Sequence, residues 1–261
     1  MTITIALAGK GGVGKTTISV MLIKYIIQAF HGPVLAVDAD PSSNLNIALG
    51  VDLEWTVGDI REGLLEQVKT SLLAGGAAMG ALPGGNTKRE YLDYQIRSSM
   101  IEGDRFDLIA MGRSEGQGCY CAVNHNLREV IDSLSRNYPF VVIDNEAGLE
   151  HLSRRTTRDV QHLIIVSDPT LRGIKAAERI VELKNELNIL VENTHLIINR
   201  VNGSLPQVLA DEIERANLPI LGLLPADSEM ESLELQGKPV IELRNDSPSS
   251  RALEQLLKQI L

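Results

Sequence analysis

The chain has 261 residues, of which 44% are hydrophobic and 23% are charged. These ordinary values, in a chain long enough to bury a large core, exclude a disordered polypeptide and a disulfide-stapled miniprotein. Its 25 Lys and Arg residues stand against 34 Asp and Glu residues, a formal net charge of −9. This acidic balance argues against nucleic acid or an anionic membrane surface as the main partner.

Short apolar strands are predicted to alternate with longer helices along the chain. The expected strands are Thr2–Ala8, Val34–Val37 (closed by Asp38), Phe106–Met111, Phe140–Ile143, Leu163–Val166, His195–Ile198 and Ile220–Leu224. The expected helices are Lys15–Phe30, Asn126–Asn137, Gly173–Leu187 and Gln207–Ala216. This alternation predicts an α/β fold, a doubly wound and mostly parallel sheet with helices on both faces. Functional loops are then expected at the carboxyl ends of the strands.

Residues 1–261 are expected to form a single domain. Ala74–Lys88 contains five glycines and few apolar residues, which indicates a loop or an insertion rather than a domain boundary. Ser249–Leu261 places five aliphatic residues on one helical face. Such a helix packs on the sheet or lies on a membrane surface, and its two cations favour packing. No signal peptide or membrane-spanning run is visible, so a cytoplasmic location is expected.

The first predicted strand leads into Gly9-Lys10-Gly11-Gly12-Val13-Gly14-Lys15-Thr16, which fits the pattern G-x-x-x-x-G-K-[ST]. The motif lies between a strand and a helix, as a phosphate-binding loop does, and this context disfavours a glycine-rich turn without a ligand. Lys15 is expected to reach the β- and γ-phosphates, and Thr16 to hold Mg²⁺. The nucleotide-binding residues predicted here are Gly9, Gly11, Gly12, Val13, Gly14, Lys15, Thr16 and Thr17.

Lys10 adds a second lysine at the start of this loop. The loop resembles the deviant phosphate-binding loop of the MinD and nitrogenase-iron-protein group of P-loop ATPases. In that group the early lysine reaches across a dimer interface to the nucleotide of the partner subunit. The resemblance implies that Lys10 is catalytic in trans and that ATP promotes a homodimer. The alternative is a lysine at a solvated loop edge.

The loop after the second strand, Asp38-Ala39-Asp40-Pro41, resembles switch I of the same group. A carboxylate near the γ-phosphate can position the attacking water by accepting a hydrogen bond from it. Asp40 is therefore the candidate catalytic carboxylate, and Asp38 is expected to support the Mg²⁺ shell. The alternative for both residues is a helix cap or an Asp-Pro turn.

Three later segments fit the same group. Asp144-Asn145-Glu146-Ala147-Gly148 resembles switch II, in which Asp144 takes the Walker B place on Mg²⁺ and Gly148 donates its N–H to the γ-phosphate. Asn199-Arg200 ends a predicted strand, and the resemblance implies that the asparagine reads the adenine edge. Pro225-Ala226-Asp227 resembles the loop that closes over the base. Both late signals are weak alone, because such residues are common in turns.

The two cysteines of the chain are Cys119 and Cys121. A disulfide across one residue would be strained, so free or metal-bound thiolates in a reducing compartment are expected. Residues two apart on an extended chain point the same way, which lets two thiolates chelate one soft metal. Two ligands are too few for a closed tetrahedral site, but a two-fold dimer axis supplies four. The alternative is two buried apolar cysteines.

The cysteine segment is similar to that of CooC-type ATPases, which mature the nickel enzymes carbon monoxide dehydrogenase and acetyl-CoA synthase. The matching segments are Cys119-Tyr120-Cys121, Asn124, Leu127-Arg128 and Ala147–Arg154. With the loops above, the resemblance covers most of the chain. It implies an ATP-hydrolysing homodimer that binds nickel or zinc between its subunits and serves a nickel enzyme. His125, Glu150 and His151 stay open as additional metal ligands.

Two other function classes remain open. A positioning ATPase of the MinD or ParA type would bind DNA or membrane and make the cysteines incidental. An iron–sulfur carrier or electron donor would hold a cluster between four interface cysteines. The acidic charge and the Cys-x-Cys spacing favour the nickel maturation factor. The client enzyme, the choice of metal, the oligomeric state without nucleotide and the role of Ala74–Tyr94 are left open.

Overall fold

In the computed structural model, residues 2–63, 88–112, 129–146, 159–187 and 190–261 are described. Within them, eight strands form one sheet in the order β3-β4-β2-β5-β1-β6-β7-β8. Their bounds are β1 Ile3–Gly9, β2 Val34–Asp38, β3 Ile101–Glu102, β4 Phe106–Ala110, β5 Phe140–Asp144, β6 Asp159–Ser167, β7 Leu190–Val201 and β8 Ile220–Pro225. Neighbouring strands are parallel throughout, apart from the antiparallel pair β3–β4.

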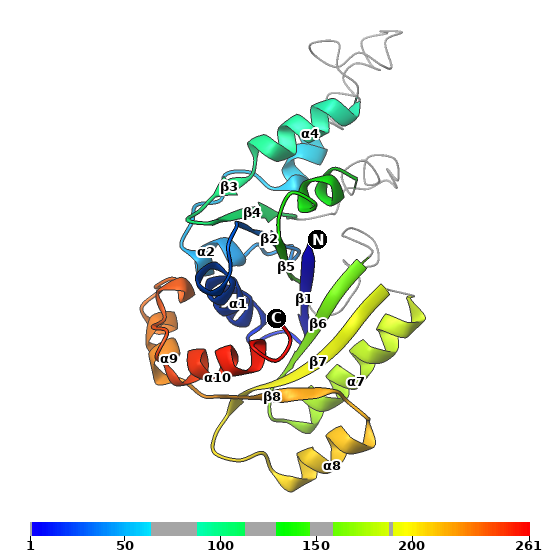
Figure 1. Cartoon of the computed structure of the whole chain (residues 1–261), viewed down its shortest axis with the longest axis vertical. Coiled ribbons are helices and arrows are strands. Elements are labelled where there is room, and N and C mark those ends of the chain that lie inside the picture. The colour runs from blue at the N-terminus through cyan, green and yellow to red at the C-terminus, as the bar shows by residue number, and fades with distance from the viewer. Residues whose placement is uncertain (1, 64–87, 113–128, 147–158, 188–189) are drawn as a thin grey trace.

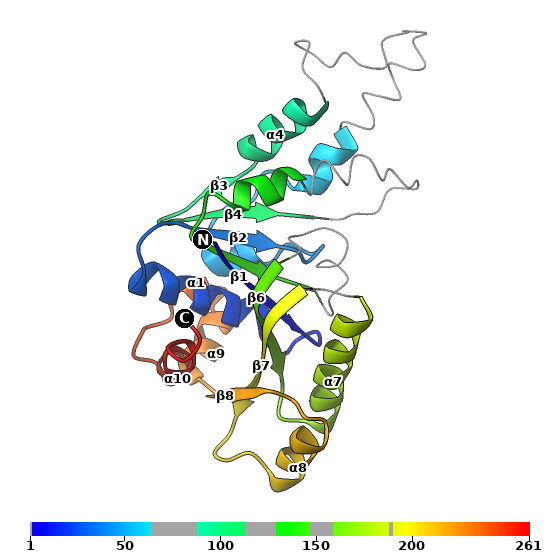
Figure 2. The same cartoon turned by 45° about the vertical axis from the view of Figure 1, so that its right-hand side comes forward.

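Helices cover both faces of this sheet (Figures 1 and 2), which confirms the predicted fold class. One face carries α1 (Lys15–Ala29), α2 (Leu45–Leu49), α9 (Ser228–Leu235), the 3-10 turn η1 (Val240–Glu242) and α10 (Pro248–Leu257). The other carries α4 (Lys88–Ser98), α7 (Leu171–Glu186), α8 (Gln207–Arg215) and the helical residues 57–63 and 129–135.

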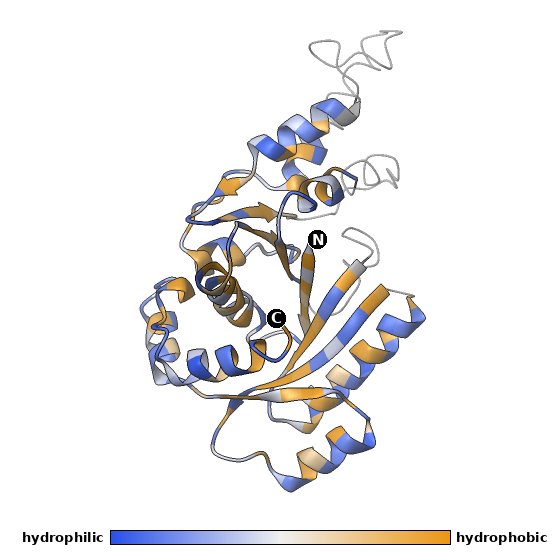
Figure 3. Cartoon of the chain, in the orientation of Figure 1, coloured by the Kyte–Doolittle hydropathy of each residue, from blue (hydrophilic) through white to orange (hydrophobic). Residues whose placement is uncertain are grey.

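Side chains alternate between the two faces of the sheet along each strand, so the protein has a hydrophobic core on each face. In β1, Ile5 and Leu7 face α1, whereas Ala6 and Ala8 face the opposite layer, and all four are fully buried. A strand that is apolar on both sides belongs in the centre of a sheet covered on both faces. Figure 3 shows this pattern as hydrophobic central strands under helices whose outer faces are hydrophilic.

The carboxyl-terminal helix packs on the sheet, as one of the two sequence alternatives predicts. In α10, Leu253 and Leu257 are buried in the core that α1 also enters. Leu256 lies over β8, where a Cβ on Gly222 would come within 2.4 Å of its side chain. Among the described helices, none is both long and apolar enough to cross a bilayer.

The strands β6 and β7 are longer than the apolar runs predict. Their amino-terminal halves contain polar residues such as Gln161, His162 and Asn193, which mask the strand pattern. The short elements α2, β3 and α9 were not expected either, because they span too few residues to show a period. The glycine-rich segment 74–87 lies outside the described residues, and Lys88 begins α4.

The winding of the sheet places three carboxyl ends together. The chain moves from β1 through α1 to β2 on one side of β1, and later continues from β5 to β6 on the other side. In the strand register, Asp144 at the end of β5 stands between Leu7 of β1 and Asp38 of β2. In doubly wound sheets, ligands bind at such a switch point.

Candidate functional site

The loop between β1 and α1 has a shape that only glycine permits at key positions. A Cβ on Gly9 would lie 2.3 Å from the carbonyl oxygen of Val166 in β6. Gly14 has φ +94°, and its Cβ would lie 2.5 Å from Nδ2 of Asn199. The loop is therefore held tightly between α1 and two neighbouring strands, with its exposed part at Lys10–Gly12.

Lys15 is buried at the start of α1, with 8% of its surface exposed. Its Nζ donates a hydrogen bond to the carbonyl oxygen of Lys10 at 3.2 Å, so the ammonium folds back over the loop. Burial lowers the pKa of Lys15, although nearby carboxylates, Asp144 first among them, act in the opposite direction. Lys10 is exposed, which both a role across a dimer interface and a solvated loop edge predict.

Asp144 joins the end of β5 to the first turn of α1. Its carboxylate accepts hydrogen bonds from Oγ1 of Thr16 at 2.6 Å and from Oγ of Ser19 at 3.0 Å. Burial raises the pKa of Asp144 to about 6, against the two hydroxyl hydrogen bonds and the charge of Lys15, which lower it. A buried carboxylate beside a threonine hydroxyl presents the hard oxygen ligands that Mg²⁺ prefers.

Asp38 is fully buried at the end of β2 and holds the following segment, up to Leu45, in place. Its two oxygens accept the backbone N–H groups of Asp40 at 3.0 Å and of Leu45, the first residue of α2, at 2.9 Å. Burial raises the pKa of Asp38 to about 7, and the nearby charge of Asp144 contributes to the rise. In this structure Asp38 thus has the helix-capping contacts that the alternative interpretation expects.

Asp40 is half-buried in the same segment, near enough to Lys15 for its charge to act on that ammonium. Its Oδ1 accepts the N–H of Ser42 at 2.8 Å, which forms an Asx turn. Its other carboxylate oxygen is not needed for that turn, so the capping contact and a role toward water are compatible.

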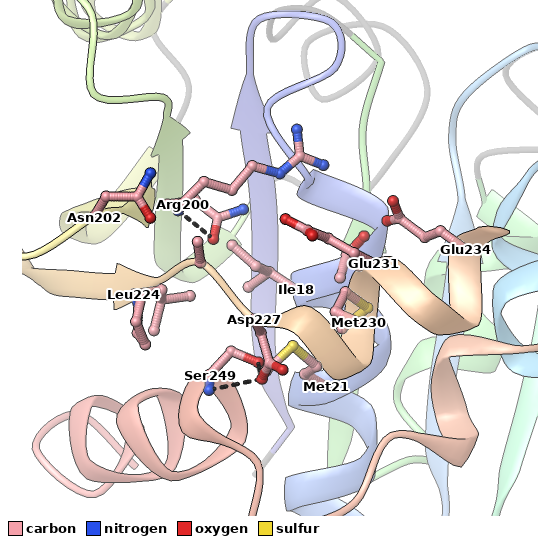
Figure 4. Close-up of a pocket in the computed structure, with 14 residues that line it drawn as sticks. Ile18, Met21, Arg200, Asn202, Leu224, Asp227, Met230, Glu231, Glu234 and Ser249 are labelled. Atoms are coloured by element: carbon pink, nitrogen blue, oxygen red, sulfur yellow. Dashed lines mark hydrogen bonds between the residues drawn. The ribbon is translucent and has the colours of Figure 1, made fainter.

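A cavity of about 380 Å³ opens beside the phosphate loop, between α1, α9, α10 and the ends of β7 and β8. Figure 4 shows Ile18 and Met230 on its apolar side, while Arg200 extends toward the phosphate loop. Small-molecule sites have volumes in this range and combine apolar walls with a few polar groups. The lining includes all four late residues predicted to bind nucleotide, namely Asn199, Arg200, Pro225 and Asp227.

Asn199 and Arg200 of this cavity are already bonded to the protein. Asn199 donates from Nδ2 to the carbonyl oxygen of Val13 at 2.9 Å, and its Oδ1 accepts the N–H of Arg200 at 2.9 Å. The guanidinium of Arg200 donates to the carbonyl oxygen of Gly12 at 3.1 Å, from a residue with φ +59°. Asn199 and Arg200 therefore tie the cavity to the phosphate loop.

Asp227 lines one side of the cavity and joins α9 to α10. It caps α9 through the N–H of Glu229, and its Oδ2 accepts the N–H and the hydroxyl of Ser249 at 3.0 and 2.6 Å. Burial alone would raise the pKa of Asp227, but the hydrogen bonds, those from Ser249 foremost, outweigh it and leave the pKa below its usual value.

Several predicted site residues lie outside the described residues. These are Cys119, Cys121, Gly148 and the open candidates His125, Glu150 and His151. In the described part of the chain, no group of three or more His, Cys, Asp or Glu side chains is arranged to hold a metal ion.

Two residues that take part in the site were missed by sequence reasoning. Ser19 lies three positions after Thr16, a spacing that brings both hydroxyls to one face of α1, so the sequence contained a signal for it. Ser249 lies 22 residues from Asp227 and on another helix, and no local pattern indicates that contact.

A phosphate loop between a central strand and a helix, with buried carboxylates at the ends of the two next strands in the sheet, defines the class of P-loop nucleotide-binding proteins. Residues 4–240 match the family model described as the CobQ/CobB/MinD/ParA nucleotide binding domain, CbiA. The chain belongs to this family of P-loop ATPases.

Individual relatives are similar over almost the whole chain. An uncharacterized ATP-binding protein of Methanocaldococcus jannaschii is 40% identical over 98% of both chains. The carbon monoxide dehydrogenase accessory protein CooC of Rhodospirillum rubrum is 29% identical over 95% of this chain and 91% of its own. Among solved structures, the septum site-determining protein MinD of Pyrococcus horikoshii in complex with Mg-ADP has a TM-score of 0.67, at 22% identity, over 100% of this chain and 96% of its own. At 22% identity, this structural similarity is evidence for the shared fold alone.

Proposed function

We propose that the protein is a dimeric ATPase that couples its nucleotide state to a metal held by Cys119 and Cys121, and so assists nickel insertion into carbon monoxide dehydrogenase or acetyl-CoA synthase. The observation that carries the proposal is the Cys-x-Cys pair, in a chain that aligns with a CooC accessory protein over 95% of its length. Residues 1–261 act as one domain, and nickel is the cargo.

Hydrolysis is assigned to the residues at the switch point of the sheet. Lys15, folded over the loop, neutralises the β- and γ-phosphates once they replace its contact with the carbonyl oxygen of Lys10. Asp40 accepts a hydrogen bond from the attacking water and aligns it with the γ-phosphorus. Lys10 of the partner subunit adds a second positive charge as the transition state forms. The loop N–H groups, including those of Gly11, Gly12 and Val13, hold the phosphate oxygens.

Mg²⁺ fits the donor set that the structure presents. Thr16 and Asp144 provide adjacent hard oxygens, and burial raises the pKa of Asp144 to about 6 despite the nearby charge of Lys15, so a divalent cation bound here would stabilise the ionised carboxylate. Thr16 would bind the ion directly, with Asp144 and Asp38 around it. The bound ion would neutralise charge that develops on the phosphate oxygens.

The base is assigned to the cavity lined by Asn199, Arg200, Pro225 and Asp227. Its position beside Thr17 at the start of α1 supports this, because a nucleotide whose phosphates lie on the loop can extend its base there. To read the adenine edge, Asn199 would exchange one of its present partners for the base.

The coupling between the nucleotide state and the metal site is assigned to switch II, the segment from Asp144 to Gly148. Gly148 contacts the γ-phosphate, and its release after hydrolysis changes the dimer interface where the four thiolates meet. Metal and nucleotide must then alter each other's affinity by the same factor. A metal affinity that is the same with and without nucleotide would contradict this coupling.

The first experiment measures metal content and mass at equilibrium for the metal-stripped chain, without nucleotide and with ADP or ATP. The expected result is one nickel or zinc per two chains, dependent on nucleotide and lost in the double variant Cys119→Ser/Cys121→Ser. Nucleotide-driven dimers whose metal content is unchanged by this double substitution would favour a positioning ATPase. Absorption near 400 nm in anaerobically purified protein would favour an iron–sulfur carrier.

A complementation experiment tests Lys10 separately from the metal. Lys10→Ala and Asp40→Ala are each expected to be inactive, but a mixed dimer contains one complete site if Lys10 acts in trans. An equal mixture should then recover about a quarter of the native ATPase rate, since half of the dimers are mixed and each has one working site. No recovery, with mixed dimers present and both single variants inactive, would show that Lys10 acts within its own subunit; a fully active Lys10→Ala would show that it has no role.

A further inference from the structure

Two imidazoles face each other on neighbouring strands, away from the nucleotide site. Nδ1 of His162 in β6 and Nε2 of His195 in β7 share a hydrogen bond of 3.1 Å, in which the tautomers decide which nitrogen donates, and the ring centroids are 5.3 Å apart with planes 24° apart. In the strand register His162 pairs with Asn193 and His195 with Ile164, so the two histidines are diagonal neighbours on one face of the sheet.

The distance between these nitrogens matches a chelate. Metal–imidazole bonds of about 2.0–2.1 Å place two ligand nitrogens roughly 2.9 Å apart at a right angle and about 3.3 Å apart at the tetrahedral angle. The observed 3.1 Å lies between these values. We propose that His162 and His195 form a second metal site, which takes a borderline divalent cation such as Cu²⁺, Ni²⁺ or Zn²⁺ and is independent of the cysteine pair.

The setting of the pair suits ligation by neutral imidazole. Burial lowers the pKa of His162, with Glu192 acting in the opposite direction, and burial and the charge of His162 lower the pKa of His195. Both rings are then mainly neutral at pH 7, and a change of tautomer that moves the shared proton to the far nitrogen of its ring leaves a lone pair on both facing nitrogens, with no net loss of a proton. The strands on which they sit are hydrogen-bonded on both sides, which fixes the spacing of the two nitrogens.

The pair is also reachable from solvent. Both histidines are half-buried, and Asn193 beside them is exposed. In Figures 1 and 2 the amino-terminal halves of β6 and β7 extend past α10, and none of the described helices crosses them on that face. Within the described residues no third His, Cys, Asp or Glu completes the set, so water fills the remaining positions and the cation stays exchangeable.

The test uses the full chain, stripped of metal, with both cysteines replaced (Cys119→Ser/Cys121→Ser) so that the thiolate site cannot contribute. Calorimetric titration with Cu²⁺ and with Ni²⁺ should give one site per chain, tighter for Cu²⁺. His162→Gln and His195→Gln should each weaken this site at least ~10-fold, because loss of even an outer-shell partner costs 10- to 100-fold. His31→Gln, an exposed histidine elsewhere in the chain, is the matched control and should leave the affinity unchanged.

A spectroscopic readout separates ligation from folding. The electron paramagnetic resonance spectrum of the Cu²⁺ complex should show coupling to two imidazole nitrogens, reduced to one in either single variant. Binding of a fluorescent ADP analogue checks that each variant is folded. Equal Cu²⁺ affinity in the double variant His162→Gln/His195→Gln, with ADP binding intact, would overturn the proposal. If the metal-content experiment finds no nickel that depends on Cys119 and Cys121, the proposed function fails, but the histidine site is still tested by these titrations.

Discussion

The two halves of the nucleotide site differ in how complete they are without a ligand. Around the base cavity, Asn199 and Asp227 have partners for their polar groups: Asn199 joins β7 to the phosphate loop, and Asp227 joins α9 to α10. Around the loop itself, the pKa values of Asp38 and Asp144 are raised by burial and that of Lys15 is lowered. In the first half the polar groups have hydrogen bonds that stabilise them as they are, whereas in the second half burial disfavours the charged forms of Asp38, Asp144 and Lys15.

This difference separates binding from chemistry. A preorganised cavity costs little to order when the base enters it. Buried charges of both signs stay costly until phosphates and a cation arrive, and their arrival stabilises the liganded state more than the free one. Substitutions on the base side should therefore act mainly on stability and affinity, and substitutions on the phosphate side mainly on hydrolysis and on pH dependence.

The largest effect is expected for Lys15→Ala. Removal of the only buried ammonium on the described part of the loop should lower the rate of ATP hydrolysis at least ~100-fold, as loss of one preorganised donor to a transition state does. The exposed Lys175→Ala on α7 is the control and should change the rate less than ~2-fold. A steady-state phosphate-release assay measures both, and a rate near native for Lys15→Ala would remove this lysine from the mechanism.

On the base side, Asp227→Ala should lower the free energy of unfolding by about 2–3 kcal/mol, because two donors of Ser249 and the N–H of Glu229 lose a buried acceptor. Urea denaturation measures the change. Asp211→Ala removes an exposed carboxylate bonded to Gln207 and should cost less than ~0.5 kcal/mol. An equal loss of unfolding free energy in both variants would show that the hydrogen bonds of Asp227 between α9 and α10 contribute no more to stability than a surface contact.

The pH dependence of stability tests the phosphate side. Asp38 and Asp144 have folded pKa values of about 7 and about 6, above the ordinary value near 3.9, so the folded state binds more protons than the unfolded state in this range. Their contribution to stability is complete below about pH 4 and is lost as pH rises through 7.

The nucleotide-free protein should therefore lose part of its resistance to urea between pH 5 and pH 8. Asp144→Asn should lose less over the same interval, because an amide needs no proton to stay neutral. Saturating Mg²⁺ and ADP should reduce the native slope in the same way. A native stability that rises over this interval, or an unchanged slope in Asp144→Asn, would contradict the assignment.

The smallest effect is expected for Asn199→Ala, which removes hydrogen bonds to Val13 and Arg200 and should cost about 1 kcal/mol of stability. The relative affinities for ATP and GTP distinguish two roles of Asn199. If Asn199 reads adenine, ATP binding should weaken more than GTP binding in this variant. If it only supports the loop, both should weaken equally. Fluorescent nucleotide competition distinguishes the two.

Local signals in the sequence predict the phosphate loop and the central strands well. The motif from Gly9 to Thr16 is contiguous, and strands such as β1 and β5 are apolar on both faces, so neither needs knowledge of distant partners. Contacts between separate elements could not be predicted. Ser249 meets Asp227, and His162 meets His195, only because helix packing and strand register bring them together. The polar halves of β6 and β7 hide their strand character for the same reason, since pairing, not composition, makes them strands.

The central place of β1 has a consequence for synthesis of the chain. This strand is made first, yet its two neighbours are β5, which begins at Phe140, and β6, which begins at Asp159. At 5–20 residues per second, a ribosome needs roughly 7–26 seconds to add the residues between β1 and β5. Throughout that time the apolar segment Ile3–Gly9 has neither of the two strands that flank it in the sheet. The nascent chain should therefore depend on chaperones that hold apolar segments during translation, more than a protein of equal size with local strand pairing would.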